Sequence, residues 1–235
     1  MKKFFSGEGG FFGFMDKIAS LFWINLLTTL CCIPVITAGA SFTACYYVTL
    51  KMVRNEEGYL TKSFFKSFRM NFRQSTVIWI FEAILIFIFA ADFRIITTRA
   101  AGPIPLSNVI LVVTGILLFL LLMTAVYVYP ILARFDNTTV NTVKNAFLMG
   151  IANFPKTVAL IVTNALFPAL IFAVVMTGRG LWVIPVILCF GISASAYLCS
   201  RILVGVFDTY MPAEEEQPDD AGDTNKSDTE EIREE

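Results

Sequence analysis

The sequence predicts an all-α fold, a polytopic membrane helical bundle, and three observations support that prediction. Of the 235 residues, 56% are hydrophobic and only 16% are charged, whereas ordinary globular domains have about 45–50% apolar and about 25% charged residues. The mean hydropathy is +0.69, and long runs between residues 18 and 205 carry almost no charge. A single soluble core cannot bury that much apolar surface, so lipid is the expected second apolar environment.

Hydropathy divides the body of the chain into about six candidate spans. They are 18–33, 38–53, 75–93, 108–131, 157–177 and 181–205. A helix needs about 20 residues to cross a hydrocarbon core of about 30 Å, and the last four spans meet or approach that length. The first two are short and are broken at Pro34, which predicts either a tight hairpin or a broken helix. We prefer the hairpin, because one span kinked at Pro34 would move the N-terminal lysines to the outer side.

Small and weakly polar side chains indicate where these spans pack against one another. Gly191, Ser195 and Cys199 recur at every fourth position of the last span, and Ala40 and Ala44 do so in the second. This spacing allows close approach of helix backbones. We interpret the five cysteines as small buried hydrophobic residues; they are Cys31, Cys32, Cys45, Cys189 and Cys199.

Residues 60–74 predict an amphipathic helix on the inner face of the membrane. At about 100° per residue, its four cations share an arc of about 80° and its four phenylalanines share another of about 100°. The cations are Lys62, Lys66, Arg69 and Arg73, and the phenylalanines are Phe64, Phe65, Phe68 and Phe72. The rings are expected to enter the acyl boundary. The helix then either orients the next span, docks another membrane subunit or recognises lipid headgroups.

Glu82 is the acid that lies well inside a hydrophobic run. An ionised carboxylate there costs several kcal/mol, so we expect a neutral, paired or water-facing side chain. The sequence leaves two interpretations open, a functional acid or a structural partner of Arg201, Thr28 or Thr29.

A weak internal repeat is a further hypothesis. The motif N-F-x-[QK]-[ST] occurs at 71–75 and again at 153–157, an offset of 82 residues. Each copy precedes a long apolar span, so each unit would consist of a span, an inner loop with a short surface helix, and a second span. Chance resemblance between two phenylalanine-rich loops explains the motif about as well.

The distribution of charged residues predicts the membrane topology and divides the chain into three segments. With both termini inside, 13 lysines and arginines of the body lie on the inner side and three on the outer side. We therefore expect a multi-pass protein of the cell membrane with both termini cytoplasmic. Residues 1–17 are a lead-in, 18–205 the transmembrane domain and 206–235 an acidic disordered tail; residues 212–235 alone hold 11 of the 19 acids.

The composition gives little support to enzymatic chemistry. The chain has no histidine, which removes imidazole catalysis and histidine-ligated metal sites. No nucleophile elbow, phosphate-binding loop, metalloprotease motif or paired-carboxylate site occurs. We predict no enzyme activity, no cofactor, no metal and no nucleic-acid partner.

Two blocks of the chain resemble the YesL-like family of small bacterial membrane proteins. The first holds the Pro34–Ala40 turn, 46–54, Glu57-Gly58 and 64–74, and the second holds 134–137 and 144–157. The resemblance covers about residues 5–205, with one departure at Ala40, where the family typically has proline. It implies an uncharacterised integral membrane protein whose genes often neighbour those of carbohydrate ABC importers and sugar-responsive two-component systems.

Together with what this resemblance implies, the sequence predicts a non-enzymatic accessory or regulatory component of carbohydrate uptake or sugar sensing. The expected partners are the lipid bilayer and either ABC importer subunits or a sensor kinase. The contact surface would be the helix 60–74 with the loop 134–156. The alternative is an autonomous small-solute transporter, which the possible repeat and Glu82 favour.

Overall fold

The computed structural model describes residues 10–56, 58–98, 104–178, 180 and 182–210, and in these ranges the regular elements are all helical. This confirms the predicted fold class. In chain order the helices are α1 (Gly10–Cys32), η2 (Val35–Thr37), α2 (Ala38–Arg54), α3 (Leu60–Thr98), α4 (Ile104–Arg134), α5 (Thr139–Ala152), α6 (Phe154–Thr177) and α7 (Val183–Tyr210).

Five of the described helices are long and apolar enough to cross a membrane, not six. They are α1, α3, α4, α6 and α7, which makes the chain a multi-pass membrane protein. The predicted second span forms α2, but this helix has only 17 residues, or about 25 Å at 1.5 Å per residue. Twelve of its residues are buried. Its polar residues are therefore covered by protein, as the sequence predicted.

The region around Pro34 is a hairpin turn, as we preferred. Lys17 near the start of α1 donates a hydrogen bond to Asn55 beyond the end of α2, at 3.4 Å. The Thr37 hydroxyl closes the turn on the carbonyl of Pro34 at 2.7 Å. Helices α1 and α2 are thus antiparallel, and a single span kinked at Pro34 is excluded for this chain.

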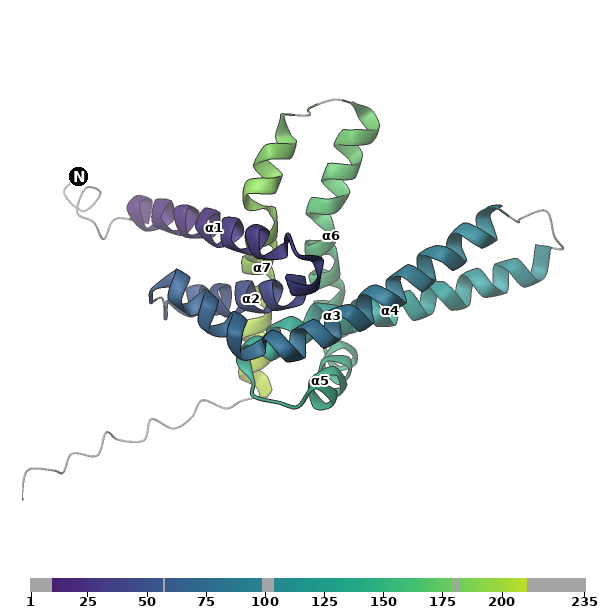
Figure 1. The fold of residues 1–235 in the computed structure, drawn as a ribbon, viewed down its shortest axis with the longest axis horizontal. Helices are drawn as coiled ribbons and strands as arrows, with labels where there is room; N and C mark the ends of the chain where they lie inside the picture. Colours follow the sequence, from purple (N-terminus) through teal and green to yellow (C-terminus); the bar gives the residue numbers. More distant parts are fainter. Residues whose placement is uncertain (1–9, 57, 99–103, 179, 181, 211–235) are drawn as a thin grey trace, which may run out of the picture.

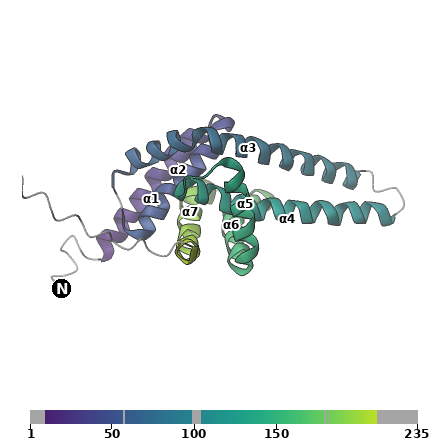
Figure 2. The same ribbon diagram turned by 90° about the horizontal axis from the view of Figure 1, so that it is seen from below.

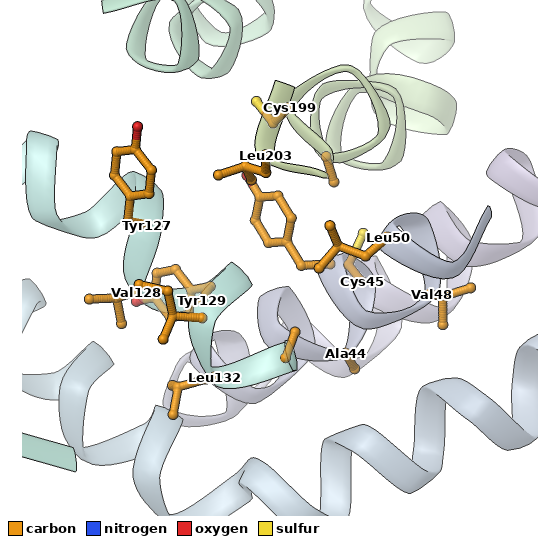
Figure 3. Close-up of a cluster of buried hydrophobic side chains, with 14 of the residues drawn as sticks. Ala44, Cys45, Val48, Leu50, Tyr127, Val128, Tyr129, Leu132, Cys199 and Leu203 are labelled. Atoms are coloured by element: carbon orange, nitrogen blue, oxygen red, sulfur yellow. The ribbon is translucent and has the colours of Figure 1, made fainter. Parts of the chain in front are cut away.

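Most of the buried hydrophobic core comes from α2, α4 and α7, and α1, α3, α5 and α6 add one or two residues each. Figure 3 shows side chains of this cluster on α2 (Ala44 and Val48), α4 (Tyr127) and α7 (Leu203). The Thr49 and Ser200 hydroxyls hydrogen bond across the buried α2–α7 contact at 2.9 Å. The small residues named above in α2 and α7 are all buried, which confirms that they serve packing.

Two helical hairpins diverge from this core. One arm consists of α3 and α4 and the other of α6 and α7, and the two point in different directions (Figures 1 and 2). Their outer faces expose large apolar side chains; Phe87 is 75% exposed and Phe172 is 63% exposed. Such faces suit lipid contact. Cys189 is also exposed, so its predicted burial is wrong; Cys31 and Cys32 are only partly buried, and Cys45 and Cys199 are buried as predicted.

Residues 60–74 do not form a separate helix but the first part of α3, which has 39 residues. At 1.5 Å per residue its length is about 58 Å, nearly twice the hydrocarbon thickness of about 30 Å. The first turns of α3 therefore extend beyond the hydrocarbon region. The predicted loop 134–156 is likewise mostly helical, because α5 occupies 139–152 and packs Thr142, Ala146 and Gly150 inward.

The helical body is longer than the 18–205 that we predicted. Helix α1 begins at Gly10, within the predicted lead-in, and α7 continues to Tyr210. Residues 211–235, most of the predicted acidic tail, lie outside the described residues. The ends of α2 and α7 meet in an ion pair between Arg54 and Asp208, and Asn153 donates to the Tyr210 hydroxyl at 3.1 Å. The end of α2, the start of α6 and the end of α7 thus share one end of the molecule.

Candidate functional site

The four cations of the first part of α3 form one exposed surface, which we call the α3 basic face. It consists of Lys62, Lys66, Arg69 and Arg73. None of the four has a hydrogen bond or ion pair with another described residue. The predicted charged stripe therefore exists, and the described residues of the chain leave its charges unmatched.

The phenylalanine side of the same segment faces protein more than the prediction allowed. Phe64 is fully buried, 0% exposed, and its ring stacks on Phe68 with 6.3 Å between centroids. Phe65 and Phe72 are exposed by 38% and 39%. The expectation that all four rings enter the acyl boundary is wrong for Phe64, because the α2 surface provides an apolar site for it.

Two side-chain hydrogen bonds fix this segment at both ends. Trp23 of α1 donates its indole N–H to the Thr61 hydroxyl at 2.9 Å. Gln74 donates its amide to the carbonyl of Asn137, between α4 and α5, at 3.0 Å. The α3 basic face is thus held in a defined orientation, which a recognition surface requires.

Three other cations at this end of the molecule have partners, whereas Arg134, Lys144 and Lys156 have no hydrogen bond or ion pair with another described residue. Arg54 pairs with Asp208, and the Lys51 ammonium lies 4.7 Å from the centroid of the Tyr47 ring. Lys17 is hydrogen bonded to Asn55. The α3 basic face is distinguished by having four unmatched cations along one stretch of a single helix.

Glu82 is buried, at 6% exposure, and is paired with tyrosine rather than with the residues we predicted. The Tyr129 hydroxyl of α4 donates to Oε2 of Glu82 at 2.5 Å. The three predicted partners lie elsewhere: Arg201 is exposed, Thr28 donates to the carbonyl of Ile24, and Thr29 is exposed. Tyr127 and Tyr129 are two positions apart in α4 and therefore point to opposite sides of the helix. Tyr129 points toward Glu82 of α3, whereas Tyr127 lies beside Thr157 of α6.

An interhelical cavity of about 450 Å³ lies among α1, α2, α4, α6 and α7. Its lining residues include no charged side chain. The polar ones are Thr29, Tyr46, Tyr129, Asn164 and Ser195, and the remaining walls are apolar side chains and Gly191. Sequence inspection missed this site, since its residues come from five helices and share no motif.

Asn164 organises the polar part of the interhelical cavity. Its Oδ1 accepts hydrogen bonds from the Tyr46 hydroxyl at 3.4 Å and the Ser195 hydroxyl at 3.1 Å. Its Nδ2 donates to the Leu160 carbonyl at 2.9 Å and to Sγ of Cys199 at 3.1 Å. An amide inside a hydrophobic span was a visible signal, but the sequence did not show which helices it joins.

Comparison with known proteins gives one partial match. A protein-family profile described as "Protein of unknown function, DUF624" matches residues 18–93, which is less than half of the chain. The match covers most of α1, all of η2 and α2, and most of α3, so it includes the α3 basic face and Glu82. It does not include the second block of the resemblance, 134–157. No curated protein and no solved structure matches the chain.

Proposed function

We propose that this chain is a non-enzymatic accessory or regulatory protein of the cell membrane that acts by contacting another membrane protein. The observation that supports the proposal is the α3 basic face. Its cations are exposed and unmatched within the described chain, while Phe64 and Ser67 of the same segment are buried against the protein. A helix that only rested on lipid would turn its apolar side toward lipid.

The partner we propose is a subunit of a carbohydrate ABC importer or a sugar-sensing kinase. This part of the proposal rests on the resemblance to the YesL-like family, which we extend from the matched region to about residues 5–205. Helix α5 belongs to the same surface, since Gln74 of α3 is hydrogen bonded to the link that precedes α5. We assign both termini to the cytoplasm, as the distribution of lysine and arginine favours.

Crosslinking in the native membrane tests this contact. The double charge reversal Lys66→Glu with Arg69→Glu should lower recovery of the partner by about tenfold, because like charges then oppose each other across the contact. The matched control, Lys66→Arg with Arg69→Lys, preserves both positive charges and should retain recovery. Equal recovery from the parent chain and both variants would remove the α3 basic face from the proposal.

The alternative, an autonomous small-solute transporter, is favoured by the buried Glu82–Tyr129 pair. An acid within a membrane span is a default candidate for ion coupling. The test is uptake by the purified chain in liposomes, with Glu82→Gln as the variant. Uptake that is lost in the variant supports transport. If liposomes containing the chain take up none of the candidate sugars and ions, the result favours the accessory role over the transporter.

A further inference from the structure

The interhelical cavity has walls that select a chemical class of ligand. Its volume of about 450 Å³ falls within the range of about 300–1,000 Å³ that small-molecule sites occupy. A charged headgroup inside it would lack a counter-charge, because the lining residues include no charged side chain. A sugar would bring many hydroxyls to walls that offer few partners. The cavity therefore suits a neutral and mainly apolar ligand.

The hydroxyls of the cavity lining favour a ligand that donates a hydrogen bond. Tyr46 and Ser195 both give their protons to Asn164, and Tyr129 gives its proton to Glu82. Each hydroxyl oxygen keeps lone pairs that can accept a further hydrogen bond. Three such oxygens contribute to the lining of one cavity.

We propose that the interhelical cavity binds a neutral lipid with a hydroxyl headgroup, whose apolar chain lies between the two arms and whose hydroxyl donates to Tyr46, Tyr129 or Ser195. The cavity is formed largely by membrane-spanning helices, so the surrounding bilayer can supply such a molecule directly. The proposal is independent of the partner contact on the α3 basic face.

The experiment uses the full chain in phosphatidylcholine nanodiscs with a photoreactive hexadecanol that carries a mid-chain diazirine. Labelling should saturate and should map to the stretches of α6 and α7 that line the cavity. Unlabelled hexadecanol should compete about fivefold better than its methyl ether, the factor expected for one neutral hydrogen bond. Labelling that does not saturate, or equal competition by the ether, would overturn the proposal.

Two variants with a matched control locate the site. Ala125→Phe fills the cavity from α4 and should lower labelling of α6 and α7 at least fivefold, about the loss of one contact of that strength. Ala173→Phe adds the same ring on an exposed face of α6 and should change nothing. Ser195→Ala is a smaller change that keeps the packing. It should reduce the roughly fivefold advantage of hexadecanol over its methyl ether as a competitor of labelling. Undiminished labelling of Ala125→Phe would overturn the site, and an unaltered difference in Ser195→Ala would remove Ser195 as the acceptor.

Discussion

Two regions of the molecule carry the same short motif, and their comparison shows what such a motif determines. Asn71 in α3 and Asn153 before α6 each donate their amide to a carbonyl four residues earlier, at 3.2 and 3.3 Å. Ser75 and Thr157, at the same offset of 82 residues, each donate back to the carbonyl of that asparagine, at 2.7 and 3.0 Å. The two copies thus have the same local bonds, although the same hydroxyl bond occurs at other helical threonines such as Thr43 and Thr163.

Several residues 82 positions apart in the two regions are also buried to the same extent. Phe64 and Ala146 are both fully buried, and so are Ser75 and Thr157. Glu82 and Asn164 also correspond, and each joins its helix to another through a tyrosine hydroxyl. The two regions therefore turn equivalent faces toward the core.

The helices nevertheless differ in continuity. Helix α3 runs unbroken through the motif, whereas the second region divides into α5 and α6 at Asn153. Arg73 in the first copy corresponds to Pro155 in the second. Proline lacks the N–H that would continue the helix and disfavours helical backbone in the preceding residue. The break at Asn153 therefore coincides with a proline in the first turn of α6, where the continuous helix α3 has Arg73.

The largest expected loss of stability comes from placing the proline of the second motif copy into the first copy, in the interior of α3. Arg73→Pro removes a backbone donor in the interior of α3 and should lower the free energy of unfolding by about 3 kcal/mol or more. Arg73→Ala, its control, should stay within about 0.5 kcal/mol of the parent. Unfolding of the purified chain in detergent measures both. Equal stability of the two variants would contradict a continuous α3.

The next largest effect is the loss of stability when Gly39, which packs against the first copy of the motif, or Gly150, just before the second copy, is replaced by alanine. A Cβ at Gly39 would overlap the Ser75 carbonyl oxygen and lie 2.7 Å from Cβ of Trp79, so Gly39→Ala should cost about 2–3 kcal/mol. A Cβ at Gly150 would meet Cγ of Met123 at 2.8 Å. Met123 is buried and must shift from its Cγ outward, so Gly150→Ala should cost about 1–2 kcal/mol, less than at Gly39 because no backbone atom is in the way.

Gly205 provides the control for both glycine substitutions. It lies in α7, and a Cβ added there would meet nothing within 4 Å. Gly205→Ala should leave the free energy of unfolding unchanged or raise it by up to about 1 kcal/mol. The same detergent unfolding assay ranks the three variants. A Gly39→Ala chain as stable as Gly205→Ala would show that α2 and α3 are not so close.

A smaller effect distinguishes the two hydroxyls of the motif. Thr157 also donates to the Gly150 carbonyl at 2.8 Å and lies 3.1 Å from the buried Tyr127 hydroxyl. Thr157→Ala should therefore cost about 1–2 kcal/mol, since Tyr127 loses its partner. Ser75→Ala loses only bonds within its own helix and should cost less than about 0.5 kcal/mol. Equal losses in the unfolding assay would contradict this difference.

The smallest expected effect is that of Pro155→Ala. Proline is tolerated in the first turn of α6, so stability should change by less than about 1 kcal/mol. The new amide at position 155 should become hydrogen bonded and slow to exchange with deuterium, as α5 and α6 join. A fast-exchanging amide would show instead that packing of α5 on α4 maintains the break.

Much of the fold could be predicted from the sequence, because hydropathy and Pro34 mark helices through local chemistry. Most of the spans, the hairpin and the basic stripe on α3 were visible in this way. The partner of Glu82 was not, since Tyr129 lies 47 residues away and nothing in a linear pattern specifies that pairing. The burial of Phe64 was missed for the same reason.

The sequence by itself determined that this chain is a helical membrane protein with a basic helical face, because composition and periodicity act over neighbouring residues. The tertiary structure alone decided that α2 is a buried core helix and that Tyr46, Asn164 and Ser195 meet in one cavity. Those outcomes depend on packing between helices distant in the chain, where close approach and hydrogen bonding select one arrangement among many.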